Sequence, residues 1–179
     1  MSLSTAASVS GDLRSSRKAR QFAVAACMTM SLCAPGVQAA EDQARPDYGP
    51  DITLDTAKQL AAGAVGECRQ QHWKVAVAIV NTHGSLVYYE RMDNTQSASA
   101  RIAVDKASAA AMYRRTTREF ADTVNKSGPA VTTLPGVIAS PGGLPVMRDG
   151  KVIGGIGVSG MTGDQDEQCA KAGLANLNP

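Results

Sequence analysis

Apolar and polar positions alternate along the chain with periods that predict a helix followed by a β-hairpin. From Leu54 the apolar side chains recur at steps of three and four residues, which describes one helix face, with Thr53 as its N-cap. A β-branched run over 75–80 and an apolar run over 86–89 flank the turn residues 81–84. Two such runs joined by turn chemistry predict two antiparallel strands.

The second half of the chain repeats this hairpin signal. Asp149-Gly150 separates the apolar runs 144–148 and 151–158, and this dipeptide is the strongest short-range signal for a hairpin. Residues 127–144 are rich in glycine and proline and predict a loop. Three further segments have helical patterns: 97–112, 117–124 and 164–177. Two hairpins with segregated helices predict an α+β fold, an antiparallel sheet flanked by helices, and not a doubly wound sheet.

The first 39 residues have the pattern of a secretory signal peptide. A basic cluster precedes the apolar run 22–34, Pro35-Gly36 breaks that run, and 37–39 place small residues ahead of a cleavage point before Ala40. A membrane anchor or a buried helix is the alternative, but the apolar run is short for a bilayer span. We therefore expect a periplasmic or extracellular protein, with a flexible leader over 40–50 and one domain over 51–179.

Removal of this segment changes the charge of the chain. The full chain has 18 basic and 16 acidic residues, and the first 39 residues hold four of the basic and one of the acidic ones, so the mature chain has a net charge of −1. Aromatic residues make up only 4%. A near-neutral chain with few aromatic side chains argues against a nucleic-acid partner and against polybasic membrane contact.

Two of the four cysteines, Cys68 and Cys169, lie in the predicted mature chain. An even pair in an oxidising compartment favours a disulfide, and both cysteines fall on predicted terminal helices that could pack together. Two buried, unpaired thiols are the alternative.

Several short motifs lack the context that their chemistry needs. Residues 155–160 satisfy G-x-G-x-x-G, but the chain has no room after them for the helix, parallel strand and acidic residue of a dinucleotide site. We expect these glycines to permit close backbone packing. His72 and His83 are both possible haem-iron ligands, although a position near a helix end and a place in an exposed turn explain them as well.

Polar groups gather around the predicted loop in a way that suggests an anionic ligand. Met92 follows the second strand, Arg101 and Lys106 lie on the helix after it, and Gly142 and Gly143 enter the third strand. Cationic side chains beside a glycine-lined loop suit haem propionates or a small organic acid. A solvated helix face with surface ion pairs explains the same charges.

At these residues the sequence resembles the GlcG/HbpS-like haem-binding family, which includes the C-terminal domain of PduO-type proteins. The segments that carry the resemblance cover nearly the whole predicted mature domain: 77–81 through Gly84, 91–93, 106–107, 142–146, 149–160 and 166–170. Asn81 stands where the family has an aspartate, and both residue types serve in such a turn.

The resemblance implies an antiparallel sheet flanked by helices and assembly into homo-oligomers. For secreted members it also implies haem binding or haem-linked redox sensing. Thr117 matches the threonine that opens a helix in the family, near the expected pocket, and the resemblance therefore makes it a candidate for the iron side.

Our hypothesis from the sequence is a secreted, single-domain, oligomeric protein that binds haem. Arg101 and Lys106 would hold the propionates, Thr117 or Met92 would face the metal, and Gly142 and Gly143 would line the site. The alternative is an enzyme that acts on a small organic acid in the same cleft, with Lys106 as acid/base or anion anchor. A third possibility is a structural or signalling partner.

Overall fold

The computed structural model describes residues 44–177. The predicted signal peptide over 1–39 lies outside these described residues. The elements are α1 (Leu54–Gln70), β1 (Ala76–Val80), β2 (Leu86–Arg91), α2 (Ser99–Tyr113), α3 (Thr117–Ser127), the 3₁₀ helix η1 (Pro129–Thr133), β3 (Gly143–Arg148), β4 (Lys151–Ser159) and α4 (Gly163–Ala175).

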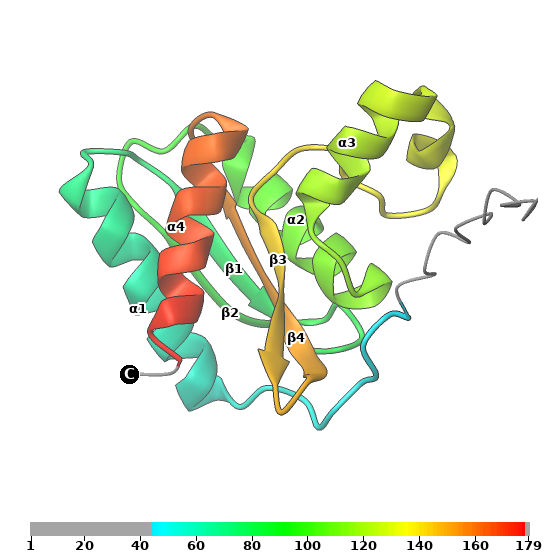
Figure 1. Ribbon diagram of the computed structural model, residues 1–179. Coiled ribbons are helices and arrows are strands. Elements are labelled where there is room, and N and C mark those ends of the chain that lie inside the picture. Colours follow the sequence, from blue (N-terminus) through cyan, green and yellow to red (C-terminus); the bar gives the residue numbers. More distant parts are fainter. Residues whose placement is uncertain (1–43, 178–179) are drawn as a thin grey trace, which may run out of the picture. The chain divides into compact units, whose positions relative to one another are not determined.

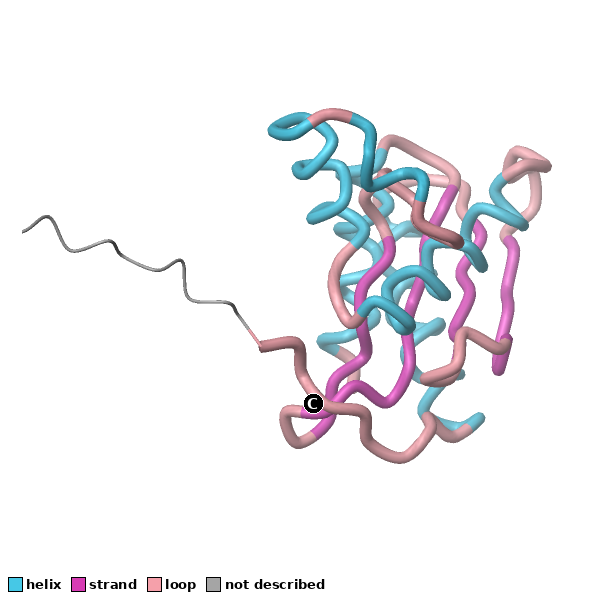
Figure 2. Tube along the Cα trace, turned by 90° about the vertical axis from the view of Figure 1, so that its right-hand side faces the viewer, coloured by secondary structure: helices cyan, strands magenta, loops and turns pink. Residues whose placement is uncertain are grey.

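The four strands form one antiparallel sheet in the order β2-β1-β4-β3. Figure 2 shows them running side by side. Both predicted hairpins are present, and the central pairing of β1 with β4 joins them. The predicted α+β fold class is therefore confirmed. β3 contains Pro145, which an edge strand tolerates because one side of it needs no ladder hydrogen bonds.

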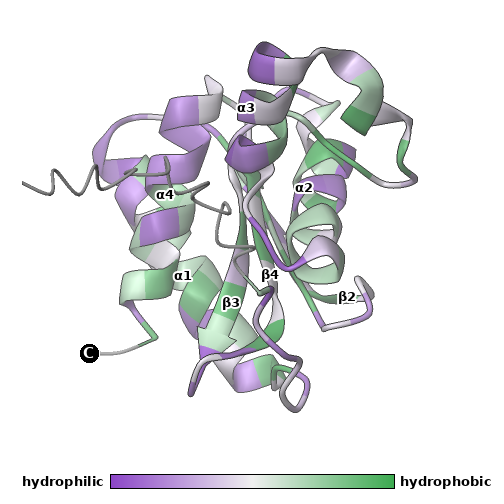
Figure 3. Ribbon diagram, turned by 45° about the vertical axis from the view of Figure 1, so that its right-hand side comes forward, coloured by the Kyte–Doolittle hydropathy of each residue, from purple (hydrophilic) through white to green (hydrophobic). Residues whose placement is uncertain are grey.

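Helices cover both faces of the sheet (Figure 1). α1 and α4 pack on one face, where Val77 and Ile79 of β1 point, whereas α2 packs on the other face against Ala76, Ala78 and Val80. Because side chains alternate along a strand, β1 is buried on both faces. Figure 3 shows hydrophobic colour along the strands and hydrophilic bands on α3.

The alanine-rich face of α2 lies unusually close to β4. A side chain at Gly155 would bring its Cβ within 3.0 Å of the Ala107 carbonyl, and one at Gly157 would do the same against the Ala103 carbonyl. Gly155 and Gly157 of the G-x-G-x-x-G segment therefore permit close packing, as the sequence predicted, and they lie in β4, whereas Gly160 directly follows the strand.

The predicted turn between β1 and β2 is built around Asn81. Its Oδ1 accepts hydrogen bonds from the backbone N–H groups of His83 (3.0 Å) and Ser85 (2.9 Å). Asparagine thus caps the turn with its side-chain oxygen, the atom type that an aspartate would also supply.

The segment before α1, predicted as a flexible leader, is hydrogen-bonded to β4 over its last residues. Val152 donates its N–H to the Asp47 carbonyl and accepts one from Gly49. This parallel bridge between Tyr48 and Val152 fixes Tyr48 beside the sheet. Among the described residues, no helix is both long and apolar enough to cross a membrane.

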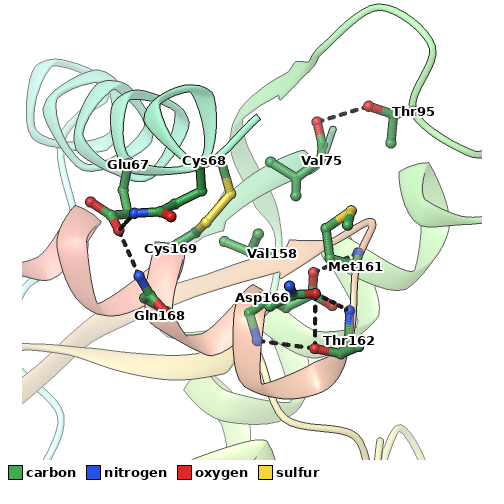
Figure 4. The surroundings of a disulfide bond; sticks show 12 residues. Glu67, Cys68, Val75, Thr95, Val158, Met161, Thr162, Asp166, Gln168 and Cys169 are labelled. Carbon is green, nitrogen blue, oxygen red and sulfur yellow. Dashed lines mark hydrogen bonds between the residues drawn. A yellow bond between two sulfur atoms is a disulfide. The ribbon is translucent and has the colours of Figure 1, made fainter. Parts of the chain in front are cut away.

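A disulfide joins α1 to α4 through Cys68 and Cys169, which confirms the predicted pairing in this structure (Figure 4). Their Cα atoms are 5.6 Å apart, both side chains are fully buried, and the sequence separation is 101 residues. Beside the bridge, Gln168 donates to the Glu67 carboxylate at 2.7 Å. The cross-link closes almost the whole domain into one loop.

We predict that replacing both cysteines by alanine lowers the free energy of unfolding by about 2–5 kcal/mol, because a loop of this length restricts the unfolded chain strongly. Urea unfolding with and without reductant measures this. Reductant should lower the unfolding midpoint of the wild type toward that of the double alanine variant. The midpoint of the variant itself should not change with reductant, which makes it the control for effects of the reductant. A wild-type protein with the same midpoint in both conditions would contradict the prediction.

Candidate functional site

Lys106 lies inside the protein, although the sequence suggested that it faces a ligand. Its side chain on α2 is only 2% exposed, and its Nζ donates to Asp166 Oδ2 at 2.8 Å and to the Val158 carbonyl at 3.1 Å. Asp166 is equally buried and also accepts the Met161 N–H at 3.0 Å. Two of the three N–H donors of the ammonium group are used by this internal network.

Burial raises the pKa of Asp166, and this effect exceeds the opposing hydrogen bond and charge of Lys106. A carboxyl whose folded pKa is raised contributes less stability as the pH rises through that pKa. At neutral pH the fold therefore depends on Lys106 to compensate the buried carboxylate.

Thr117, Gly142 and Gly143 pack around the same pair. The Thr117 hydroxyl accepts the Gly143 N–H at 2.9 Å and is itself fully buried. Gly142 has a φ of 119°, and a Cβ there would meet Lys106 Nζ and the Val158 carbonyl within 3.0 Å. The sequence correctly placed these residues together, but they form a filled junction and not an open crevice.

The other two predicted ligand-binding residues lie elsewhere. The Arg101 side chain is 81% exposed and pairs with Asp105 one turn along α2, with Nε to Oδ1 at 2.9 Å. Met92 is half-buried after β2. It lines a pocket of about 300 Å³ together with Arg69, Lys74, Glu90, Arg91 and Asp93. Ligand contact by any of the six residues stays a prediction, and Lys106 and Thr117 have almost no exposed surface with which to make it.

We predict that Lys106→Met destabilises the protein by about 3–5 kcal/mol near pH 7, because it leaves the Asp166 carboxylate buried and unpaired. The loss should be smaller near pH 4, where the carboxyl is more readily protonated. Urea unfolding at both pH values measures this. The double variant Lys106→Met/Asp166→Leu is the control and should regain stability at neutral pH. Equal losses at the two pH values would contradict the prediction.

A second pocket, of about 440 Å³, lies where the segment before α1, the β1–β2 turn and the end of α2 meet. Its lining combines Tyr48, Gly49, Thr82, His83 and Met112. The Tyr48 hydroxyl donates to the Met112 carbonyl at 2.8 Å and so ties the segment before α1 to α2. Tyr48 and Met112 remain 44% and 51% exposed, which gives the pocket an apolar mouth.

Hydrogen bonds position His83 at this pocket. Asp51 Oδ1 accepts from the Thr82 hydroxyl at 2.5 Å and from the Thr82 N–H at 3.0 Å. The Thr82 hydroxyl lies 3.1 Å from His83 Nδ1, and the imidazole is otherwise 80% exposed. The hydrogen bonds from Thr82 lower the pKa of Asp51, with a smaller contribution from His83, so the carboxylate is ionised at neutral pH.

Two consecutive arginines follow α2, and the first of them, Arg114, lies beside Tyr48. Arg114 ends α2 in the left-handed conformation (φ 53°, ψ 42°), and its guanidinium lies 5.2 Å from the centre of the Tyr48 ring. Arg115 stacks on Phe120 at 3.9 Å, and its buried Nε has no hydrogen-bond partner among the described residues. Burial, then the charge of Arg45, lower the pKa of Arg115. Arg114, with its left-handed backbone, thus lies against Tyr48 of the second pocket. Residues in such uncommon backbone conformations cluster at ligand sites.

Sequence reasoning missed most of this pocket. It named His83 only as one of several possible ligands, and it did not identify Tyr48, Met112 or Arg114. One signal in the sequence could have identified Met112. It directly follows Ala111, the last alanine of the buried face of α2, so its side chain points away from the sheet.

Comparison with known proteins assigns the family. Residues 52–175 match the family model described as "Haem degrading protein HbpS-like". The chain belongs to the HbpS-like family. The resemblance seen in the sequence is therefore confirmed, and it spans the domain from the segment before α1 to the end of α4.

Individual HbpS-like relatives agree with this assignment. Protein GlcG of Escherichia coli is 39% identical over 108 residues, which are 60% of this chain and 81% of GlcG. The corrinoid adenosyltransferase PduO of Salmonella typhimurium is 34% identical over 132 residues, 71% of this chain but only 39% of that protein. This chain thus corresponds to a part of PduO.

Two solved structures have the same fold. A double mutant of HbpS from Streptomyces reticuli is 33% identical, with a TM-score of 0.69 over 74% of this chain and 90% of HbpS. The crystal structure of a PduOC:haem complex is 30% identical, with a TM-score of 0.66 over 72% of this chain and 96% of PduOC.

Proposed function

We propose that this protein binds haem in the pocket formed by Tyr48, Thr82, His83 and Met112. The observation that carries the proposal is the donor set, because histidine, methionine and tyrosine are the side chains that commonly bind haem iron and all three line one pocket. The haem complex of the related PduOC supports haem as the ligand class. When bound, haem supplies an iron centre that takes axial ligands and can change its redox state.

The surroundings of the pocket suit the two ends of a haem molecule. Tyr48 and Met112 offer exposed apolar surface to a planar macrocycle. Arg114, stacked on Tyr48, offers a guanidinium group to a propionate, and such charge-assisted contacts are strong and directional. In this proposal Arg114 has the role that the sequence suggested for Arg101 and Lys106.

We further propose that the protein handles haem outside the cytoplasm, in the periplasm or the extracellular medium, as a homo-oligomer. The signal-peptide pattern over 1–39 and the disulfide between Cys68 and Cys169 support this location, because disulfides persist in oxidising compartments. Haem-linked redox sensing is the specific role that we propose there.

Titration of the purified mature protein with hemin tests the proposed function. We expect a saturable shift of the Soret band at one equivalent per chain, because the donor set lines the Tyr48–His83 pocket of the described domain. A change in absorbance that only follows free hemin, without saturation, would contradict haem binding.

A matched pair of arginine variants tests the anchor. We predict that Arg114→Asn weakens hemin binding about tenfold, because a charge-assisted hydrogen bond contributes about 1.5–3 kcal/mol. Asparagine is chosen since it tolerates the left-handed backbone at this position. Arg101→Asn is the control and should bind like wild type. The opposite ranking would favour the cleft at Arg101 that the sequence suggested.

The pocket beside Met92 favours a second candidate function, the binding or turnover of a small organic acid. Arg69, Lys74 and Arg91 line it, and none of these three forms a salt bridge with another described residue. These three cations outnumber the two acidic lining residues, Glu90 and Asp93, so the pocket of about 300 Å³ has a net positive lining that suits a small carboxylate.

We predict that small dicarboxylates broaden or shift the backbone NMR signals of residues 90–93 and that Arg91→Gln abolishes the effect, because the guanidinium can hold a carboxylate with two hydrogen bonds. Arg148→Gln, at the far end of β3, is the control. Unchanged signals at millimolar dicarboxylate would exclude this second function.

A further inference from the structure

Hydrogen bonds link three side chains at the proposed haem pocket, those of Asp51, Thr82 and His83, and their donors and acceptors can be assigned. Asp51 and His83 lie on either side of the Thr82 hydroxyl, at 2.5 Å and 3.1 Å. A hydroxyl has one proton to donate, whereas an ionised carboxylate can only accept. The Thr82 proton therefore points to Asp51.

This leaves only a lone pair of Thr82 for His83. The Nδ1 atom of His83 must then be the donor in its contact with Thr82, so the proton of the neutral imidazole is on Nδ1. The other ring nitrogen, Nε2, is left with a free lone pair on a side chain that is 80% exposed and lines the pocket.

The same arrangement orients histidines in metal sites. A ligating histidine typically donates its second N–H to a carboxylate, a carbonyl or a water, which fixes the tautomer and makes the ligating nitrogen more basic. Here the carboxylate acts through a threonine hydroxyl, and its Oδ2 also lies 3.9 Å from His83 Nδ1, where its charge favours a proton on the same nitrogen. Tyr48, by contrast, has already committed its hydroxyl proton to the Met112 carbonyl, and the Met112 sulfur faces Gly84.

We propose that Nε2 of His83 is the iron-binding atom of the haem pocket and that Asp51 and Thr82 are positioning residues that hold its tautomer. This inference rests on the proposed haem-binding function. It selects one of the two histidines that the sequence offered as possible iron ligands and assigns the ligating nitrogen.

The tautomer can be tested without any ligand. In ¹⁵N NMR spectra of the haem-free protein, recorded at a pH where the imidazole is neutral, we expect the proton of His83 on Nδ1. Thr82→Val removes only the hydroxyl and keeps the N–H that bonds to Asp51, and this variant should lose the preference. A proton on Nε2 of His83 in the wild type would overturn the inference.

The second test uses hemin and two glutamine variants. His83→Gln should lose the spectrum of a histidine-bound haem, and added imidazole should restore it, whereas the control His72→Gln should behave like wild type. Thr82→Val should weaken hemin binding about tenfold, at the lower end of what loss of a supporting hydrogen bond costs a metal site.

The outcomes separate the two proposals. Wild-type protein that shows no saturable hemin spectrum overturns haem binding and this inference together. Wild-type protein that binds hemin, with a His83→Gln variant of identical spectrum, overturns only the assignment of His83.

Discussion

The close approach of α2 to β4 is the constraint on which the rest of the structure depends. Glycine at 155 and 157 lets the backbone carbonyls of Ala103 and Ala107 come nearer to the sheet than any side chain would permit. Because interiors are packed densely, an added methyl group at either glycine would push the middle of α2 away from β4. The position of both ends of α2 follows from this contact.

The middle and the C-terminal end of α2 make different contacts. In its middle, the approach lets Lys106 reach the Val158 carbonyl near the end of β4 and the Asp166 carboxylate, which ties α2 to the start of α4. At its C-terminal end, it brings Met112 and Arg114 beside the β1–β2 turn and Tyr48. The pocket that we propose for haem therefore depends on the packing of the alanine face of α2 against Gly155 and Gly157 of β4.

The sequence predicted local structure well and long-range polar contacts poorly. Asp149-Gly150 and the turn around Asn81 specified both hairpins, since turn chemistry acts over a few residues. The role of Lys106 was not predictable in the same way, because its partner Asp166 is 60 residues away and a lysine on a helix is usually solvated. Its neighbours Ala103, Ala107 and Ala110 were the available sign that this face is buried.

The pocket residues were missed for a related reason. Tyr48 belongs to a polar, proline-containing segment that predicts a flexible leader, and only its pairing with Val152 makes it part of the domain. The two described pockets lie at opposite ends of the β1–β2 hairpin, one at the turn with His83 and the other at Arg91. The sequence predicted one ligand site near the end of β2. The structure instead has one pocket there, beside Met92, and a second pocket at the β1–β2 turn.

Paramagnetic broadening by ferric haem locates the ligand most directly. In an NMR spectrum of the isotope-labelled protein with one equivalent of hemin, the amide signals of Gly49, Thr82, Gly84 and Met112 should disappear while those near Arg91 and Arg101 persist. Loss of the Arg91 or Arg101 signals, with those of the Tyr48–His83 pocket intact, would contradict the account.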